Sequence, residues 1–328
     1  MEQLQFSIIV PVYNRSDEMC ELLESLSHQT DRDFEVVVME GACTDSCADV
    51  CHRYSDRLNI YFYVRDTGRS ARRNEGMRLA HGNYFLLFDS DCALPPDYIT
   101  KLRSALAQHY VDCYGGPDTA NATFTDLQLA INYSMTSIMT TGGIRGGMKN
   151  VERFLPRAFN MGFSRKVFDA TGGYLEMIGE DVDLSMRIKE AGFSVRLIPD
   201  AVVYHKRRIT MKGFYRQVNT FGKARVLLTS RHPGSLKIMH LFPSCFALGN
   251  IGLVLLALIS CNLWWLAPIA LYVAMIFVES YLKNRKGHVA ALSIVASYAQ
   301  LCGYGFGFID ELVTRRASKR AAESLYRQ

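Results

Sequence analysis

Tyr84-Phe85-Leu86-Leu87-Phe88-Asp89-Ser90-Asp91 is the stretch that decides the expected fold. Its apolar part predicts a buried strand, and the strand stops on two carboxylates one residue apart. Open α/β sheets bind ligands at the carboxyl ends of their strands, so Asp89 and Asp91 mark a candidate site. Two such acids cannot both enter a core without a partner, and their hard oxygen atoms suit Mg²⁺ or Mn²⁺ beside the phosphates of a nucleotide. The alternative is a solvated turn.

Apolar segments at 6–13, 34–39 and 60–64 precede this strand, and stretches with helical spacing separate them. This alternation predicts an α/β fold with a doubly wound, Rossmann-like and mostly parallel sheet. A short apolar strand near the end of this region stops at His205. His205 is a candidate third metal ligand, although a lone histidine is more often structural.

Positive charge gathers just before the Asp89 strand, at Arg69, Arg72 and Arg73. These side chains lie where a diphosphate would bind if the strand ends form a pocket. Arg73 and Asn74 are the candidates for direct contact with it, because guanidinium groups suit phosphate oxygens. The alternative is a solvated helix start.

A second acidic motif follows at residues 180–183. Apolar residues recur at helical spacing after it, which places Glu180 and Asp181 at a helix N-terminus, where the dipole favours negative charge. Simple capping would explain both acids equally well. Asp183 and Arg187, at i and i+4, are expected to pair on the helix surface.

Charge is distributed unevenly in the second half of the chain. The formal net charge is +5, yet residues 201–278 contain no Asp or Glu, and nine Lys or Arg lie between Lys206 and Lys237. A basic run beside apolar stretches is typical of a membrane surface, because anionic lipids attract such cations, and it argues against a nucleic-acid partner. Residues 1–6 lack the basic start and apolar run of a secretion signal.

Apolar stretches at 238–261 and 263–278 predict a transmembrane helical hairpin. Arg231 and Lys237 precede the hairpin and basic residues follow it at 283–286, so both of its ends are expected to face the cytoplasm. A third apolar stretch, at 289–313, is weakened by three glycines and by Asp310. We expect that stretch to be interfacial or re-entrant, with a third crossing as the alternative.

Several motifs taken together, in this order and spacing, resemble family 2 glycosyltransferases with the GT-A fold. The resemblance spans about residues 6–205, and many bacterial members continue into apolar C-terminal segments as this chain does. The motifs are Val10-Pro-Val-Tyr-Asn14, the turn from Glu40-Gly41 to Asp45, Ala71-Arg-Arg-Asn74, Asp89-x-Asp91, Gly172-Gly173-Tyr174, Gly179-Glu-Asp-Val-Asp-Leu184 and Val203-Tyr-His205.

The resemblance implies a role for each residue on the donor side. Pro11, Tyr13 and Glu40 would line the nucleobase pocket, with Glu40 accepting the imide proton of a uracil. Asp89 would lie by the ribose and phosphate, and Asp91 would coordinate the metal ion. Here Met39 stands where the family usually has another acid, which bears on the choice of base.

On the acceptor side, the resemblance implies that Asp181 is the catalytic base and that Glu180 helps to hold the acceptor. The acceptor hydroxyl would attack the anomeric carbon in one inverting displacement. Polymer-forming members carry Gln-x-x-Arg-Trp after this point, whereas Gln217 is followed here by Val-Asn-Thr220-Phe221. The missing Arg and Trp favour transfer of a single sugar.

The sequence therefore predicts an inverting, metal-dependent glycosyltransferase. It would move one sugar from a nucleotide-sugar, by resemblance a UDP-sugar, to a lipid-linked or saccharide acceptor in cell-envelope polysaccharide synthesis. Its expected place is the bacterial inner membrane, with the catalytic domain in the cytoplasm. The predicted segments are a GT-A catalytic domain at 1–205, a basic amphipathic connector at the membrane surface at 206–237, the hairpin at 238–282, and a third apolar segment with a basic tail at 283–328.

Two alternatives stay open. A polyprenyl-phosphate sugar synthase would use the same sheet and base but a bare lipid phosphate as acceptor. A non-catalytic nucleotide-sugar-binding component of a polysaccharide export complex would bind the donor without turnover. Binding alone does not require a base beside a metal site, so the two acidic motifs disfavour the second alternative.

Overall fold

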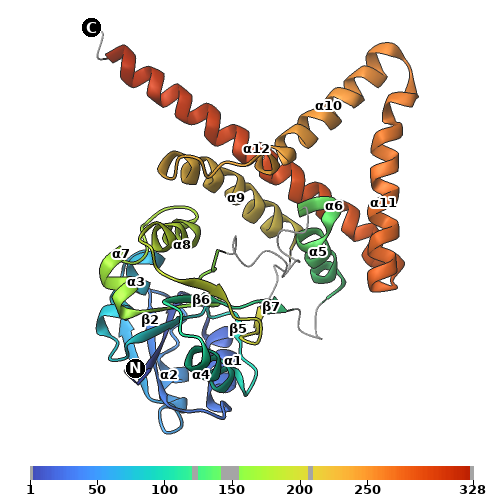
Figure 1. Cartoon of the computed structure of the whole chain (residues 1–328). Coiled ribbons are helices and arrows are strands. Elements are labelled where there is room, and N and C mark those ends of the chain that lie inside the picture. Colours follow the sequence, from blue (N-terminus) through green and yellow to red (C-terminus); the bar gives the residue numbers. More distant parts are fainter. Residues whose placement is uncertain (1–2, 120–124, 142–154, 206–209, 326–328) are drawn as a thin grey trace. The chain divides into compact units, whose positions relative to one another are not determined.

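The computed structural model describes residues 3–119, 125–141, 155–205 and 210–325. The chain forms two compact units, shown in Figure 1. Unit 1 contains residues 1–121 and 149–206, and unit 2 contains residues 122–148 and 207–328. Each unit has its own core and is described separately below.

Unit 1 is built on a seven-stranded sheet with the strand order β3-β2-β1-β4-β8-β6-β9. All neighbouring strands are parallel except β8, which runs antiparallel to both β4 and β6. The predicted α/β, mostly parallel sheet is confirmed. The strands are β1 (Phe6–Val12), β2 (Phe34–Glu40), β3 (Ile60–Val64), β4 (Tyr84–Leu87), β6 (Cys113–Gly115), β8 (Met161–Ser164) and β9 (Val195–Leu197).

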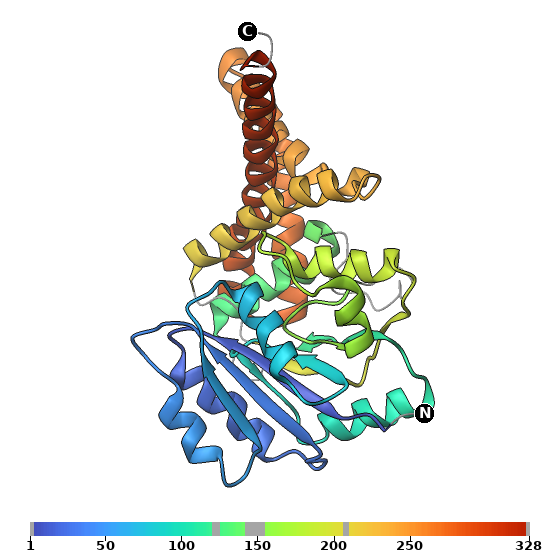
Figure 2. The ribbon, with the colours of Figure 1, turned by 90° about the vertical axis from the view of Figure 1, so that its left-hand side faces the viewer.

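Helices cover both faces of this sheet because its central strands are apolar on both sides. In β1, Ile8 packs with α1, α2 and α4, whereas its neighbour Ile9 packs with α3, α7 and α8. Figure 2 shows helices on either side of the blue strands. The helices are α1 (Ser16–Ser27), α2 (Ala48–Tyr54), α3 (Arg69–Leu79), α4 (Tyr98–Gln108), α7 (Arg165–Thr171) and α8 (Glu180–Glu190).

A small second sheet in unit 1 brings distant segments to the end of β4. Its strands are β5 (Cys92–Ala93), β10 (Val203–His205) and β7 (Asp118–Thr119), in that order. In the antiparallel pair of β10 and β5, His205 is opposite Cys92. The backbone of His205 therefore lies beside the segment that follows Asp91.

Unit 2 is helical, and three of its helices are long and apolar enough to cross a membrane, over Phe242–Ser260, Leu263–Asn284 and Gly287–Arg315. The predicted hairpin corresponds to the first two. The third stretch forms one continuous helix, and the number of crossings stays a prediction. The elements are α5 (Asp126–Thr136), α6 (Ile138–Thr141), α9 (Met211–Arg231), η2 (Ile238–His240), α10 (Phe242–Ser260), η3 (Leu263–Leu266), α11 (Ala267–Asn284) and α12 (Gly287–Leu325).

Helix α5 belongs to unit 2, although the sequence suggested that residues 1–205 form one domain. Its apolar side chains Ile131 and Met135 are buried in a cluster with Phe214 of α9 and Val289 of α12. An apolar helix face of this kind must be buried against another element. For α5, that element is the pair of C-terminal helices α9 and α12. The domain boundaries stay a prediction.

The glycines of α12 lie within one continuous helix. They let the neighbouring helices approach its backbone closely. A Cβ on Gly307 would lie 2.1 Å from the carbonyl oxygen of Asn219 in α9. On α9, a Cβ on Gly222 would lie 2.1 Å from the carbonyl oxygen of Tyr304 in α12. Small residues of this kind are typical of tightly packed membrane helices. Asp310, which lies in this stretch, pairs with Lys223 of α9 at 2.6 Å.

We predict that Gly222→Ala destabilises unit 2 by about 1–3 kcal/mol, because the new methyl group must displace the backbone of α12. The measurement is thermal unfolding of the full chain in detergent. Gly249→Ala on α10 is the matched control, because nothing lies within 4 Å of a Cβ there. That control should be neutral or slightly stabilising. Equal effects of the two substitutions would show that the α9–α12 packing is looser than described.

Candidate active site

The two acidic motifs meet at the carboxyl edge of the sheet in unit 1, and Arg73 joins them. Its Nη2 donates to Oδ1 of Asp89 at 2.5 Å, and its Nη1 donates to Oε1 of Glu180 at 3.2 Å. Asp89 follows β4, Glu180 opens α8, and Arg73 lies in α3. Three elements that are far apart in the sequence therefore converge on one guanidinium group.

Arg73 is almost completely enclosed, with 1% of its surface exposed. Burial alone would lower the pKa of Arg73, but the charge of Asp89, the Tyr174 phenol and Glu180 raise it above its ordinary value. The guanidinium also lies over the ring of Tyr174, 5.1 Å from its centroid. The cation is thus fully neutralised, and it fixes the distance between the two acidic motifs.

Glu180 and Asp181 begin α8, as predicted, after Gly179 with φ of +83°. Glu180 also accepts a hydrogen bond from Nη2 of Arg69 at 2.7 Å. Asp181 is more open: its Oδ2 lies 3.6 Å from Nη1 of Arg157, and 21% of its side chain is exposed. Asp181 is thus the acid of this pair that an incoming molecule can reach.

The prediction for Asp183 and Arg187 is wrong in one respect. The two side chains pair at 2.8 Å, but the side chain of Asp183 is completely buried. Arg187 also donates to the carbonyl oxygens of Thr171 and Gly173. The pair therefore does not lie on the surface of α8. It connects that helix to the turn that contains Gly172 and Gly173.

Asp89 and Asp91 offer carboxylate oxygens of the kind that bind Mg²⁺ or Mn²⁺. Oδ2 of Asp91 lies 3.7 Å from Nη1 of Arg15. Within the described residues, no three His, Cys, Asp or Glu side chains form a ready metal cluster. The side chain of His205 lies outside that part of the structure, although its backbone is opposite Cys92. The donor chemistry therefore fits a hard divalent cation, with His205 as a neighbour in the strand register.

The predicted nucleobase residues end β1 and β2, side by side in parallel register. Tyr13 is half-exposed, at 52%, whereas Pro11 is buried in β1. Glu40 is also buried, and its oxygens accept hydrogen bonds from the backbone N–H of Cys47 and the hydroxyl of Ser46, both at 2.7 Å. Burial raises the pKa of Glu40, but these hydrogen bonds outweigh it and hold the pKa below its ordinary value. Glu40 thus anchors the loop between β2 and α2.

Asn74 has a positioning role in the described structure. Its Nδ2 donates to the carbonyl oxygen of Tyr174 at 2.7 Å, and its Oδ1 accepts from the N–H of Tyr174 at 2.8 Å. Both ends of the side-chain amide therefore hold the backbone of Tyr174, just before α8. Direct contact between Asn74 and a diphosphate stays a prediction.

Three arginines near the acidic edge have contacts that the sequence pattern did not reveal. Arg15 and Arg157 lie beside Asp91 and Asp181 respectively. Arg72 differs from its neighbour Arg73, because it is buried with 8% exposure and its Nη1 donates to the carbonyl oxygen of Thr67. Consecutive arginines look alike in a sequence, and only the direction of each side chain on α3 separates their roles.

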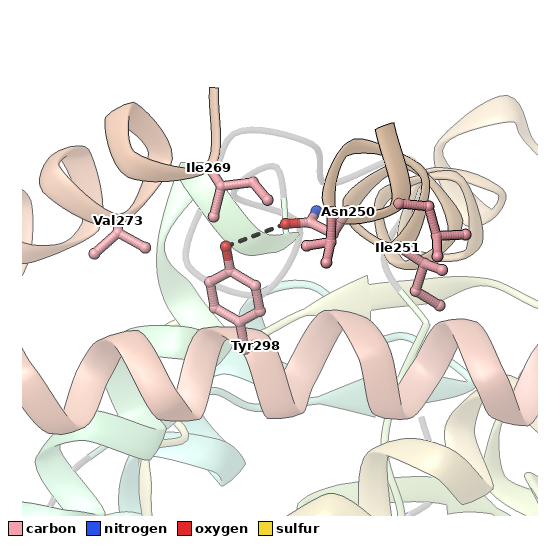
Figure 3. Close-up of a pocket in the computed structure, with 7 residues that line it drawn as sticks. Asn250, Ile251, Ile269, Val273 and Tyr298 are labelled. Atoms are coloured by element: carbon pink, nitrogen blue, oxygen red, sulfur yellow. Dashed lines mark hydrogen bonds between the residues drawn. The ribbon is translucent and has the colours of Figure 1, made fainter. Parts of the chain in front are cut away.

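Unit 2 contains an apolar hollow between α10, α11 and α12, shown in Figure 3. The hydroxyl of Tyr298 donates to Oδ1 of Asn250 at 3.3 Å, and the rest of the lining is aliphatic. It contains neither a titrating acid nor a base that could serve sugar transfer. The candidate catalytic site is therefore the acidic edge of unit 1.

A mostly parallel sheet with paired acids after β4 and at the start of α8 is the arrangement of a GT-A glycosyltransferase. A family model described as glycosyl transferase family 2 matches residues 7–172, which is just over half of the chain. The chain therefore belongs to glycosyl transferase family 2. The predicted family and enzyme class are confirmed.

Curated relatives match over part of the chain. Glycosyltransferase GlyA of Streptococcus pneumoniae is 32% identical over 110 residues, which cover 33% of this chain and 16% of that protein. Poly(ribitol-phosphate) beta-glucosyltransferase of Bacillus spizizenii is 34% identical over 102 residues, covering 29% of this chain and 15% of that protein. The chain thus spans about a sixth of the length of these relatives.

Two solved structures share the fold over most of the chain. The mannosyltransferase PcManGT from Pyrobaculum calidifontis, in complex with GDP-Man and Mn²⁺, superposes with a TM-score of 0.65 at 18% identity, covering 92% of this chain and 88% of that one. TarS 1–349 of Staphylococcus aureus gives a TM-score of 0.51 at 17% identity, covering 96% and 92%. These likenesses support the GT-A fold.

We predict that Arg73→Ala destabilises the chain by about 3–5 kcal/mol, because it leaves the carboxylates of Asp89 and Glu180 without their shared cation. Arg69→Ala is the matched control: Arg69 contacts the same oxygen of Glu180, but its side chain is 56% exposed, so the cost should stay below about 1 kcal/mol. Chemical denaturation in detergent, followed by circular dichroism, measures both. Similar losses in the two variants would contradict the bridging role of Arg73.

Proposed function

We propose that the protein transfers a single sugar, with inversion, from a nucleotide-sugar to a lipid-linked or saccharide acceptor in cell-envelope polysaccharide synthesis, and that the reaction is metal-dependent. The donor is a UDP-sugar. The observation that carries this proposal is the Arg73 bridge, which links the acid after β4 to the acid pair of α8. Sugar transfer needs a carboxylate that binds the metal ion beside the diphosphate and a second carboxylate that takes the acceptor proton, both within one site.

Asp181 is the proposed catalytic base. It is the more exposed acid of its pair, with 21% of its side chain accessible, and it stands at the first turn of α8. A carboxylate there can take the proton from an acceptor hydroxyl as that hydroxyl attacks the anomeric carbon. Glu180, which is held by Arg69 and Arg73, would help to orient the acceptor.

Asp91, Asp89 and His205 are the proposed ligands of Mg²⁺ or Mn²⁺. When bound, the cation would neutralise the charge that develops on the departing diphosphate. The strand register that places His205 opposite Cys92 supports this ligand set. The Mn²⁺ in the complex of the mannosyltransferase from Pyrobaculum calidifontis supports the use of a divalent cation, without bearing on its ligands. Arg73, which donates to Asp89, would hold its carboxylate in place for the same task.

Pro11, Tyr13 and Glu40 are proposed to line the base pocket, beside Arg73 and Asn74. Tyr13 offers a half-exposed ring for stacking. A carboxylate has about four acceptor positions, so Glu40 can hold its loop and still accept the imide proton of a uracil. Asn74 would act by holding Tyr174 in place.

The names of the relatives support the proposed acceptor, and the helices of unit 2 support the proposed location. Relatives from Bacillus spizizenii and Staphylococcus aureus are named as poly(ribitol-phosphate) glycosyltransferases, which supports a polymeric acceptor. The three apolar helices could hold this chain in the bacterial inner membrane. The basic residues that flank α10 and α11 favour a cytoplasmic catalytic unit, because such loops stay on the inner side.

We predict that the purified full chain in detergent releases UDP from one UDP-sugar when Mn²⁺ or Mg²⁺ and an acceptor are supplied. Asp91→Asn and Asp181→Asn should each reduce the rate by about 10²–10⁴-fold, the range for a lost general base or a comparable charge. Asp169→Asn, at an exposed position on α7, is the control and should keep the full rate. Removal of the metal by EDTA should stop the release.

Each other outcome has a distinct meaning. Tight donor binding without turnover, with lipid and saccharide acceptors supplied, would favour a non-catalytic binding component. Full release with polyprenyl phosphate as the only acceptor would favour the synthase alternative. Undiminished release by both Asp variants would contradict the proposed active site.

A further inference from the structure

Helix α5 begins beside the basic end of α11. Asp126 is the first residue of α5, and its carboxylate lies 3.0 Å from Nζ of Lys286 and 2.6 Å from Nε2 of His288. Lys286 lies between α11 and α12, and His288 lies in the first turn of α12. Basic residues that flank an apolar helix are typical of the cytoplasmic membrane surface. The start of α5 therefore belongs at that surface if α11 crosses a membrane.

From this point α5 and α6 follow α11 toward its apolar part (Figure 1). Oε2 of Glu279 in α11 accepts hydrogen bonds from the hydroxyls of Tyr133 and Ser137, both at 2.7 Å. The hydroxyl of Tyr272 donates to the carbonyl oxygen of Met139 in α6 at 3.0 Å. Because an α-helix rises about 1.5 Å per residue, Tyr272 lies about 10 Å beyond Glu279, farther from the basic end. Helix α6 thus lies beside the apolar part of α11.

The turn between α5 and α6 pairs its carbonyl groups with side-chain hydroxyls. The last carbonyl groups of a helix lack partners within the helix, and at a protein surface water commonly satisfies them. Here the hydroxyl of Thr140 donates to the carbonyl oxygen of Ser134, and that of Thr141 donates to the carbonyl oxygen of Met135 at 3.2 Å. A chain that leaves a helix at membrane depth must pair its backbone groups within the protein. This turn meets that requirement at both positions.

The side chains of the same segment also suit an apolar solvent. Residues 127–141 include no Asp, Glu, Lys, Arg or His. Ile138 is 74% exposed and Met139 is 39% exposed, although both belong to a helix whose backbone is bonded to α11. Water would be a poor solvent for these two side chains, whereas acyl chains suit both them and a backbone that is already paired.

We propose that α5 and α6 form a re-entrant membrane segment, in which α5 enters the bilayer beside α11 and Ile138 and Met139 contact lipid acyl chains. This inference rests on the proposed function only through the membrane location of unit 2. Residues 122–148 lie between the two parts of the sequence that form unit 1. The catalytic unit is therefore connected to the membrane by a segment other than the C-terminal helices.

The test uses a single tryptophan as a depth probe, after Trp264→Phe and Trp265→Phe remove both native tryptophans. Each full-length variant is reconstituted in phosphatidylcholine vesicles, and acyl-chain bromination of the lipid quenches a nearby indole. Leu271→Trp, at a 62% exposed position in the apolar part of α11, is the membrane reference, and Gln108→Trp, at an exposed position in α4, is the aqueous reference. Ile138→Trp should lose emission to within about twofold of the loss of Leu271→Trp, because both positions lie in one apolar layer. It should also be protected from aqueous iodide, which should quench Gln108→Trp.

Two results would overturn the inference. Quenching of Ile138→Trp by iodide and not by brominated lipid would place the turn in water. Protection from both quenchers would assign this surface to a protein contact, with unit 1 or with a second copy of the chain. If Ile138→Trp does not fold, Met139→Trp takes its place with the same expected results. An unquenched Leu271→Trp in brominated lipid is a separate result, because it would remove the proposed membrane location of unit 2 and the inference with it.

Discussion

The buried ion-pair network of Arg73 is the constraint on which unit 1 depends. A guanidinium enclosed by protein must be neutralised, and here Asp89 and Glu180 do so together. Because these acids come from the end of β4 and the start of α8, the pairing fixes the position of α3 between them. The same contact that stabilises the fold therefore assembles the candidate active site.

A comparable constraint operates in unit 2 with different chemistry. Glycines on α9 and α12 allow the two backbones to approach each other, and Lys223 of α9 pairs with Asp310 of α12. Close packing of small residues therefore joins these two helices, and the ion pair beside it leaves the Asp310 side chain 58% exposed. The apolar hairpin of α10 and α11 completes this unit.

Much of this organisation could be predicted from local patterns. Apolar runs that end on acids gave the strand ends, helical spacing gave the start of α8, and the ordered motifs gave the family. What could not be predicted depends on side-chain direction and long-range packing. Examples are the hydrogen bonds of Glu40 to its own loop, the burial of Asp183, the different partners of Arg72 and Arg73, and the inclusion of α5 in unit 2. None of these leaves a periodic signal in the sequence.

The most direct test of the central claim is an experimental structure of the full chain in detergent with UDP and Mn²⁺. The account predicts that the diphosphate lies between Asp91 and the acid pair of α8, with Arg73 still bridging Asp89 and Glu180. It also predicts the metal ion on Asp91. A diphosphate bound at another edge of the sheet, or an Arg73 released from Glu180, would contradict the view that one buried cation joins the two acidic motifs into a single active site.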